Sequence, residues 1–388
     1  MGKHSNIMGG SICERRMNCL ASYGLELQAP KPASTSYADE GTMLHSVMAK
    51  ILDGEKVEDL IGYEELGHTL TVDLVDEMIT PALRAFDNLL IGYGIENIEY
   101  ITEVNVEYPG IKAWGQTDVL GHDENYTLLV DWKFGRGVMV AGGPENYQLK
   151  FYGGAGRETP ETKDMFDPGR PIILAVIQPA APEPLTHGLI GDNRLTNFVG
   201  RMKETVELIL DEENEFDASP GKWCRFCPAA AICPAKQGLV QSLTSLGPVD
   251  PEIEPHELGL LVRQAYEVEA WASEVKALAH SELDKGRSVA GYKLVNKRAT
   301  RQWVDEGDAE TAFRKMKVKV GDFTVSKLVS PAQAEKMLKA VGKDPSVVGD
   351  LAVSRSSGTT MAEADDKRPA VTNQRGGGDL NLPASALK

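Results

Sequence analysis

The most informative part of this sequence is TLLVDWKFGRG, residues 127–137. Its apolar residues, Leu128 to Val130, run directly into Asp131, an aromatic residue and Lys133, and glycines follow. A short apolar run bounded by turn residues predicts a buried strand. Because strand side chains repeat with a period of two, Asp131 and Lys133 project from the same face. The stretch therefore predicts a carboxylate and an amine side by side where a buried strand ends.

The segment before this strand supplies a second carboxylate. Residues 113–121 alternate as a strand, and the turn HDEN joins them to residues 126–133, which predicts a hairpin. Asp118 and Asp131 then project from neighbouring strands toward one edge of the sheet. Two carboxylates near a backbone carbonyl suit Mg²⁺ or Mn²⁺, and an ammonium beside such an ion orients a water and offsets phosphate charge. The pattern predicts phosphodiester hydrolysis, although Asp-x-Lys by itself is more often an exposed ion pair.

The rest of the first 240 residues predicts an α/β fold with a mixed central sheet. The elements that we expect around the hairpin are helices at 36–53, 72–91 (interrupted at Pro81), 146–157 and 195–216, and strands at 97–107 and 172–178. Beyond them we expect a long helix at 258–283, a basic strand-like segment at 289–304, and short helices at 308–316 and 331–341. We expect a core at 1–240, an accessory region at 241–353 and, from its composition, a disordered tail at 354–388.

The charge of the chain limits how it meets nucleic acid. A formal charge of −16 argues against nonspecific coating of a polyanion, because phosphate binding is driven by Lys and Arg. Residues 285–319 are a local exception, with ten Lys or Arg against four acids. We predict DNA contacts from the strand-like part of this basic segment, at Lys293, Lys297, Arg298 and Arg301; the alternative is an ordinary solvated surface.

Apolar runs in this sequence are too short to cross a membrane. None approaches the roughly 18 residues that a span requires, and the first ten residues contain no apolar signal core. We expect a protein of the cytoplasm, without membrane partners.

Cysteine spacing points to a metal or cluster site. Cys224, Cys227 and Cys233 lie within KWCRFCPAAAICPA, where prolines constrain the loop. Three thiols so close together favour a metal site in a reducing compartment, and a fourth ligand must come from Cys13 or Cys19. Three unliganded buried cysteines are the plainer alternative.

The motifs, taken in order, resemble the PD-(D/E)xK nuclease superfamily, in its RecB-like and AddB-like exonuclease branch. GQTDVL (115–120), LLVDWKFGRG (128–137) and ENYQLKFYGGAG (145–156) follow one another like that branch's Gly-x-x-Asp strand, Asp-x-Lys strand and Gln-Leu-x-x-Tyr helix. EGTMLHSVM (40–48) resembles its histidine helix. The likeness covers about residues 10–240, and the later region resembles a phage family whose domain has no assigned function.

This resemblance implies a restriction-endonuclease-like core and a metal-dependent DNA exonuclease of a phage recombination or replication module. The implied ligands of Mg²⁺ or Mn²⁺ are His45, Asp118, Asp131 and the Trp132 carbonyl. Lys133 would position the attacking water, and Gln148 and Tyr152 would orient the site or touch the strand.

Several of these residues have plainer interpretations. Glu103 would add a carboxylate to the metal site, but Glu107 competes with it, and an acid on an edge strand is often just surface. His45 is equally typical of a core histidine on an amphipathic helix, and Tyr152 of a residue packed on the sheet.

The cysteines extend the resemblance. Nucleases of this branch often carry a 4Fe-4S cluster held by one cysteine before the core and three after it. ERRMNCLASYGLE (14–26) resembles the early segment, which makes Cys19 the fourth ligand beside Cys224, Cys227 and Cys233 and leaves Cys13 as a spare thiol. The implied cluster stabilises the fold by closing a long loop, and zinc is the alternative occupant.

Three classes of function follow. The first is an exonuclease that acts on linear DNA with a single-strand-binding or recombination partner, since the sequence has no Gly-x-x-x-x-Gly-Lys-Ser/Thr loop for a helicase of its own. The second is a non-catalytic DNA-binding scaffold, and the third is an interaction protein held together by zinc.

Overall fold

The computed structural model describes residues 4–29, 36–135, 140, 142–244, 250, 252–296, 300–323, 330–340, 342–355, 359–363 and 369–371. The chain divides into two compact units, residues 1–274 and 275–388. The division falls within a long helix, after the boundary at 240 that composition predicts.

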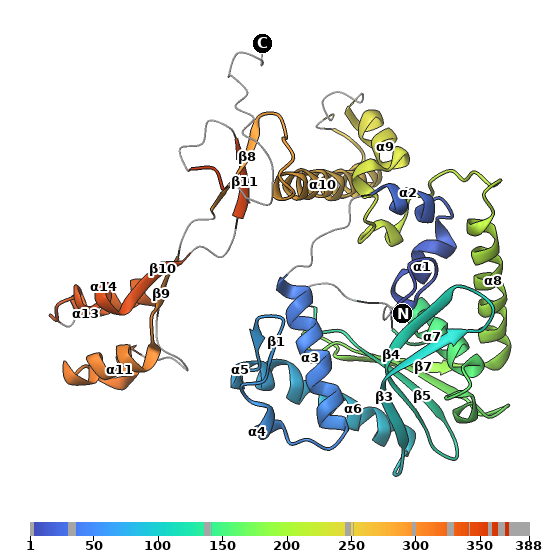
Figure 1. The fold of residues 1–388 in the computed structure, drawn as a ribbon, viewed down its shortest axis with the longest axis horizontal. Helices are drawn as coiled ribbons and strands as arrows, with labels where there is room; N and C mark the ends of the chain where they lie inside the picture. Colours follow the sequence, from blue (N-terminus) through green and yellow to red (C-terminus); the bar gives the residue numbers. More distant parts are fainter. Residues whose placement is uncertain are drawn as a thin grey trace. The chain divides into compact units, whose positions relative to one another are not determined.

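The first unit is built on a five-stranded mixed sheet with the order β3-β4-β5-β6-β7 (Figure 1). Its strands are β3 (Glu99–Tyr108), β4 (Ala113–His122), β5 (Thr127–Trp132), β6 (Ile172–Ile177) and β7 (Leu185–Ile190). Only β5 and β6 pair in parallel; the other neighbours are antiparallel. The predicted mixed sheet is confirmed, including the β4–β5 hairpin, and β7 is an additional strand that the sequence did not reveal.

The centre of the sheet is buried on both faces. Every residue of β5 and β6 is buried, which explains why these two strands appear in the sequence as continuous apolar runs. A parallel pair needs a crossover connection, and α7 (Tyr147–Glu158) supplies it between β5 and β6. Asp131 therefore lies on one of these two buried strands, and Gln148 and Tyr152 lie on the helix that joins them.

Helices cover the two faces of the sheet (Figure 1). One core cluster joins the sheet to α3 (Ser36–Leu52) and to α6 (Thr80–Tyr93). The other joins it to α1 (Gly10–Asn18), α7 and α8 (Asp192–Leu210). The remaining helices and short strands of this unit are α2 (Ser22–Gln28), α4 (Val57–Leu60), α5 (Val72–Leu74), α9 (Pro234–Thr244), β1 (Glu64–Glu65) and β2 (His68–Thr69).

The helical region around Pro81 is continuous and changes its hydrogen bonding before the proline. A π-helical turn at Val75–Ile79 separates α5 from α6, and Pro81 lies in the first turn of α6, so the change of hydrogen bonding accompanies the residue that has no N–H to donate. Gly94, at φ 68°, ends α6 in the left-handed conformation that favours glycine.

The second unit contains the end of α10 (Pro255–Asp284) and two small antiparallel sheets. Strand β8 (Tyr292–Asn296) pairs with β11 (Thr359–Glu363), and β9 (Thr300–Trp303) pairs with β10 (Ala352–Arg355). Its shorter helices are α11 (Glu306–Lys315), α12 (Val320–Phe323), α13 (Pro331–Ala340) and α14 (Val347–Leu351).

Parts of the stretch from residue 354, which composition predicts to be a disordered tail, form strand contacts in the described residues. Thr359–Glu363 form β11, and Ala370 bridges to Val295. Composition missed these contacts because a strand that adds to an existing edge gains backbone hydrogen bonds without a hydrophobic core of its own. Residues 372–388 lie outside the described residues.

Candidate carboxylate centre and cysteine pocket

The predicted catalytic residues meet at one end of the β4–β5 hairpin. Asp118 is on β4, Asp131 is the penultimate residue of β5, and Lys133 follows the strand. The Trp132 N–H donates to Asp118 Oδ2 over 2.7 Å, which fixes the first carboxylate to the strand that carries the second. The hairpin thus brings the two motifs together through local pairing.

Asp131 is held by one charged and one neutral partner. Lys133 Nζ lies 2.6 Å from Asp131 Oδ2, and Gln148 on α7 donates from Nε2 to Oδ1 over 2.8 Å. The same Gln148 nitrogen lies 3.1 Å from the Tyr152 hydroxyl, one helical turn further along. Gln148 therefore orients the carboxylate, and Tyr152 supports Gln148.

Tyr152 itself is buried, as its plainer interpretation requires. Its ring lies against Gly10 and Gly115, where an added Cβ would come within 2.6 Å and 3.0 Å of it. The ring both packs on the sheet and supports Gln148, so it reaches the centre only through that neighbour.

Two more potential ligands, His45 and Glu103, lie close to Asp118. His45 Nδ1, from α3, lies 3.2 Å from Asp118 Oδ1. One ligand atom each from His45, Glu103 and Asp118 can be chosen so that all three lie within 4.8 Å of one another. Among the residues described, this is the one group of three or more His, Cys, Asp or Glu side chains so closely spaced.

Glu103 occupies an irregular position in β3. Its φ of 49° is left-handed, which is uncommon for a residue with a side chain. The ladder pairs Thr102 with Val119 and Val104 with Thr117, but not Glu103 with Asp118. Backbone strain of this kind costs about 1–3 kcal/mol and marks functional positions more often than ordinary ones.

Both strands change face at this point. Tyr100 packs with the cluster under α3 and α6, whereas Val104, four residues on, packs with the cluster under α7 and α8. On β4, Ala113 and Leu120 both pack with the cluster under α7 and α8, although they are seven positions apart. An odd offset would place them on opposite faces of a regular strand. Regular alternation forbids both observations, so the strands reorient where Glu103 and Asp118 face the centre.

Charge compensation within the centre is nearly complete. Burial and the adjacent Asp118 raise the pKa of Asp131, against the effect of Lys133. Burial would also raise the pKa of Asp118, but His45 and Lys133 lower it. Although burial disfavours the ammonium, the two carboxylates raise the pKa of Lys133, so the amine stays charged at neutral pH.

The donor set fits a hard divalent cation. Asp131 Oδ2 is fully buried and makes no hydrogen bond of acceptable geometry, although the Lys133 ammonium is close enough for an ion pair. With the His45, Glu103 and Asp118 group beside it, the centre offers the oxygen-rich ligands that Mg²⁺ or Mn²⁺ prefers.

Two further residues define the surroundings of this centre. The Trp132 side chain is buried among the residues under α3 and α6, so only its backbone belongs to the centre. Gln116, which sequence reasoning missed, donates from Nε2 to the Glu103 carbonyl over 2.7 Å and supports the strained residue. The only signal for it was its place two residues before Asp118.

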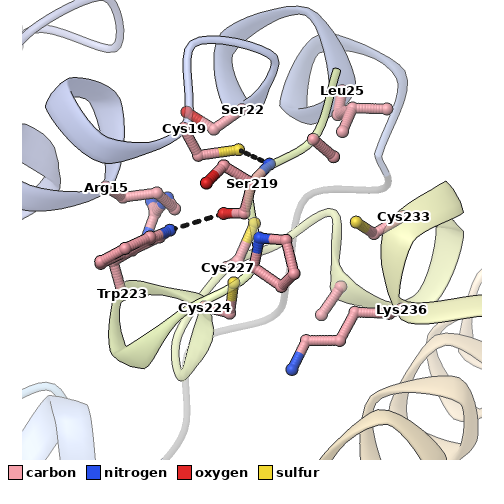
Figure 2. A pocket seen from close by; sticks show the side chains of 13 residues that line it. Arg15, Cys19, Ser22, Leu25, Ser219, Trp223, Cys224, Cys227, Cys233 and Lys236 are labelled. Carbon is pink, nitrogen blue, oxygen red and sulfur yellow. Dashed lines mark hydrogen bonds between the residues drawn. The ribbon is translucent and has the colours of Figure 1, made fainter. Parts of the chain in front are cut away.

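A second site lies at the outer end of α1. Figure 2 shows Cys19, Cys224, Cys227 and Cys233 around one pocket, with Ser219 and Trp223 at its wall. The N–H groups of Ser219 and Gly221 point to Cys19 Sγ and Cys224 Sγ, at 3.4 Å and 3.3 Å. Burial raises the thiol pKa of Cys19, and the Ser219 N–H opposes this effect by stabilising the thiolate, the form that binds metal.

Cys13 is not part of this pocket. Its side chain is fully buried in the cluster under α7 and α8, and burial raises its thiol pKa far above the ordinary range. Cys19 therefore joins the three later cysteines, and Cys13 is a core residue.

The distances between the four cysteine sulfurs distinguish a zinc ion from an iron-sulfur cluster as the group that the pocket could hold. All four cysteines are among the described residues, yet no three of their sulfurs lie within 4.8 Å of one another. Tetrahedral zinc, with Zn–S about 2.3 Å, brings its thiolates to within about 3.8 Å of each other. A cluster whose irons each bind one cysteine needs larger distances between the cysteine sulfurs.

Sequence reasoning missed the ion pairs that position the early cysteine. Glu26 on α2 accepts from Arg15 Nε at 2.6 Å and from Arg16 Nη2 at 2.8 Å, and Arg16 is 1% exposed. Arg15 also donates to the Phe226 carbonyl, between Cys224 and Cys227. These contacts join α1, α2 and the later loop; the signal was the pair of arginines shortly before Cys19.

The predicted DNA contacts of the basic segment separate into two sheets of the second unit. Lys293 is on β8 and Arg301 on β9, and these strands pair with different partners. Lys297 and Arg298 lie outside the described residues. No helix of the described residues is long and apolar enough to cross a membrane.

Fold and sites together define a mixed α/β protein with a buried carboxylate–lysine centre and a four-cysteine pocket. The chain belongs to the family described as "Protein of unknown function (DUF2800)", whose model matches residues 4–369. That description carries no activity.

Two solved structures are similar to part of the chain. One, from Eubacterium rectale, is provisionally described as an exonuclease and is 15% identical in sequence. The matched region covers 61% of this chain and 84% of that protein, with a TM-score of 0.32. The other, the protein SSO0001, is 18% identical in sequence. The matched region covers 50% of this chain and 96% of that protein, with a TM-score of 0.22. At such TM-scores neither carries an argument about function.

Proposed function

We propose that the protein is a Mg²⁺- or Mn²⁺-dependent DNA exonuclease of the PD-(D/E)xK type. The observation that carries this proposal is the convergence of Asp118, Asp131 and Lys133, with Gln148 bound to Asp131, at a strand end beside the His45, Glu103 and Asp118 group. Motifs that are separate in the sequence form one compact, buried centre. Chance ion pairs at strand ends do not assemble six polar side chains in this way.

In this proposal each residue has a defined task. Asp118, Asp131, His45 and Glu103, with the Trp132 carbonyl, would hold the ion. A bound divalent ion supplies charge for the phosphoryl oxygens and lowers the pKa of water. Lys133 stays protonated beside Asp131, so it donates hydrogen bonds and orients the attacking water without removing its proton. Gln148 keeps the Asp131 carboxylate in place, and Tyr152 keeps Gln148 in place.

The cysteine pocket is proposed to hold a 4Fe-4S cluster through Cys19, Cys224, Cys227 and Cys233. The wide spacing of the sulfurs supports a cluster over zinc. Its task is structural, because it joins the loop between α1 and α2 to a loop about two hundred residues later and lies apart from the carboxylate residues.

The activity is tested with anaerobically purified full-length protein on end-labelled linear and circular DNA, single- and double-stranded, with Mg²⁺ or Mn²⁺. We expect metal-dependent loss of linear DNA, abolished in Lys133→Ala. Lys50→Ala is the matched control, because Lys50 is on α3 and forms an exposed ion pair with Glu55. This variant should cleave like the parent. Equal cleavage by Lys133→Ala, or no cleavage of any substrate, would refute the catalytic proposal.

If the protein binds DNA without cleaving it, the non-catalytic scaffold becomes the better interpretation. The intact carboxylates and Lys133 argue against it, since a binding surface does not need two buried acids. Iron and zinc content of the same preparation decides the pocket: iron with the brown colour of thiolate-to-iron charge transfer supports the cluster, and stoichiometric zinc without colour contradicts it.

A further inference from the structure

A basic pocket lies between α7 and α8, outside both sites described above. It has a volume of about 550 Å³, within the range of about 300–1,000 Å³ that is usual for ligand pockets. Lys150 and Tyr147 come from α7, and Arg194, Phe198 and Arg201 from α8. Lys150 follows Gln148 by two residues, so the two side chains leave α7 about 200° apart and serve different sites.

Lys150 is the feature that a structural role does not explain. The residue is only 7% exposed, and its ammonium lies 4.3 Å from the Tyr147 ring centre and 5.0 Å from that of Phe198. Within the described part of the chain it makes no hydrogen bond and no ion pair. The ammonium contacts only aromatic faces and opens into the pocket, where an anion would pair with it.

The walls of the pocket add charge of the same sign. Arg201 is exposed on α8 and, among the described residues, has no ion-pair partner. Arg194 is paired with Glu145, the one acid that lines the pocket. Asn193 and Asn197 complete the wall with amide donors. Burial, together with Arg194 and Arg201, lowers the pKa of Lys150, against the opposing effect of Glu145. An anion would relieve this repulsion.

We propose that this pocket is a phosphate subsite, in which Lys150 and Arg201 bind a backbone phosphate of the nucleic-acid strand on which the enzyme acts. The inference rests on the proposed function, because it assigns the anion to a DNA strand. It also accounts for how an acidic protein holds a polyanion: the positive charge is concentrated in a pocket on the catalytic unit. Arg194 stays with Glu145 and shapes the wall.

The test measures binding of a labelled single-stranded oligonucleotide by full-length protein, without added divalent metal, over a range of salt concentrations. Arg201→Gln and Lys150→Gln are compared with the parent. Arg84→Gln, an exposed arginine on α6 at the opposite face of the sheet, is the matched control. Because Arg201 is exposed, its variant should fold even if Lys150→Gln does not.

We expect Arg201→Gln to weaken binding about twofold to fivefold at low salt, as for an exposed charge pair. The slope of log affinity against log salt should fall by about 0.7, which corresponds to one phosphate contact on a single strand. Arg84→Gln should match the parent in both quantities. Equal affinity and slope in all three variants and the parent would overturn the proposal.

A parallel titration with inorganic phosphate and with a deoxynucleoside monophosphate identifies the source of the anion. If either binds the parent but not Arg201→Gln, while oligonucleotide binding is unchanged, the pocket serves a small phosphate compound and the strand subsite is refuted. If the parent binds no oligonucleotide at all, the proposed function fails as well. The two failures are therefore distinguishable.

Discussion

The carboxylate centre and the cysteine pocket are assembled in opposite ways. The carboxylate centre takes its acids from neighbouring strands of one sheet, and each charge has a counter-charge: Lys133 for Asp131, and His45 for Asp118. The cysteine pocket takes its thiols from loops separated by two hundred residues. In the described part of the chain these loops are joined by the Ser219 N–H bond to Cys19 Sγ and the Arg15 bond to the Phe226 carbonyl.

This difference separates function from stability. The sheet holds the carboxylates in place whether or not a metal is bound, so changes at the centre should affect activity more than folding. The loops around the pocket have little core of their own, so its occupant should contribute to folding directly. Substitutions at the two sites should therefore separate loss of activity from loss of stability.

Asp118→Asn should reduce metal-dependent cleavage by about a thousandfold or more, because it removes a ligand charge while keeping the shape of the side chain. The amide oxygen can still accept from the Trp132 N–H, so the melting temperature should change by only a few degrees. Rates come from the cleavage assay and melting from differential scanning fluorimetry. Asp87→Asn, an exposed acid on α6, is the control; unfolding of Asp118→Asn would break the contrast.

Cys227→Ser should lower the free energy of unfolding by about 3 kcal/mol or more and the melting temperature by roughly 10 °C, with loss of bound metal. Cys13→Ala is the control, because Cys13 lies in the core away from the pocket. It should keep its metal and lose only the stability of a small cavity. Metal content and thermal melting are measured on both; retention of metal by Cys227→Ser would show that Cys227 is not a ligand.

Glu26→Gln should cost about 2 kcal/mol, because Arg15 and Arg16 lose a charged acceptor beside the pocket. Although burial opposes ionisation, Arg16 and Arg15 lower the pKa of Glu26. Its contribution is therefore present above the unfolded pKa of about 4.3 and is lost as pH falls through the lower folded pKa. Denaturant unfolding between pH 5 and pH 3 should show a weaker pH dependence in the variant. The same dependence in both proteins would contradict this role.

Glu103→Gly should be about 1 kcal/mol more stable than Glu103→Ala, because only glycine adopts the left-handed φ of 49° without strain. Both variants lose the carboxylate, so their difference isolates the backbone, and both should cleave more slowly than the parent. Denaturant unfolding of the pair gives the comparison. Equal stability would mean that the surrounding strands, and not the residue, set this conformation.

Much of the sheet could be predicted because its strands are buried in a simple way. The apolar runs before Asp131 and at 172–178 have the length of strands and are too short for helices of usual length. The short turn between residues 121 and 126 indicates a hairpin. The order of motifs then indicated which side chains converge. Those roles remain predictions, but the structure does bring Asp118, Asp131, Lys133, Gln148 and His45 together.

Other features depend on contacts that no local pattern records. The left-handed φ of Glu103 and the change of face around it arise from how β3 and β4 pair and twist together. The residue types at these positions do not favour either feature. Strand β7 (LTHGLI) does not alternate regularly, because it lies at the sheet edge and only Ile190 of its residues is buried. Lys150 appeared as an unremarkable position within QLKFY until α8 placed Phe198 and Arg201 beside it.

The long separation between Cys19 and the three later cysteines also sets an order of assembly during synthesis. At about 5–20 residues per second, a ribosome needs on the order of 10–40 s to make the chain between Cys19 and Cys224. By then the hairpin and β6 have emerged, so the catalytic sheet can fold first. Under the proposed cluster assignment, the early thiol would have to stay reduced throughout this interval, and loading of the cluster would be a late event that closes an existing fold.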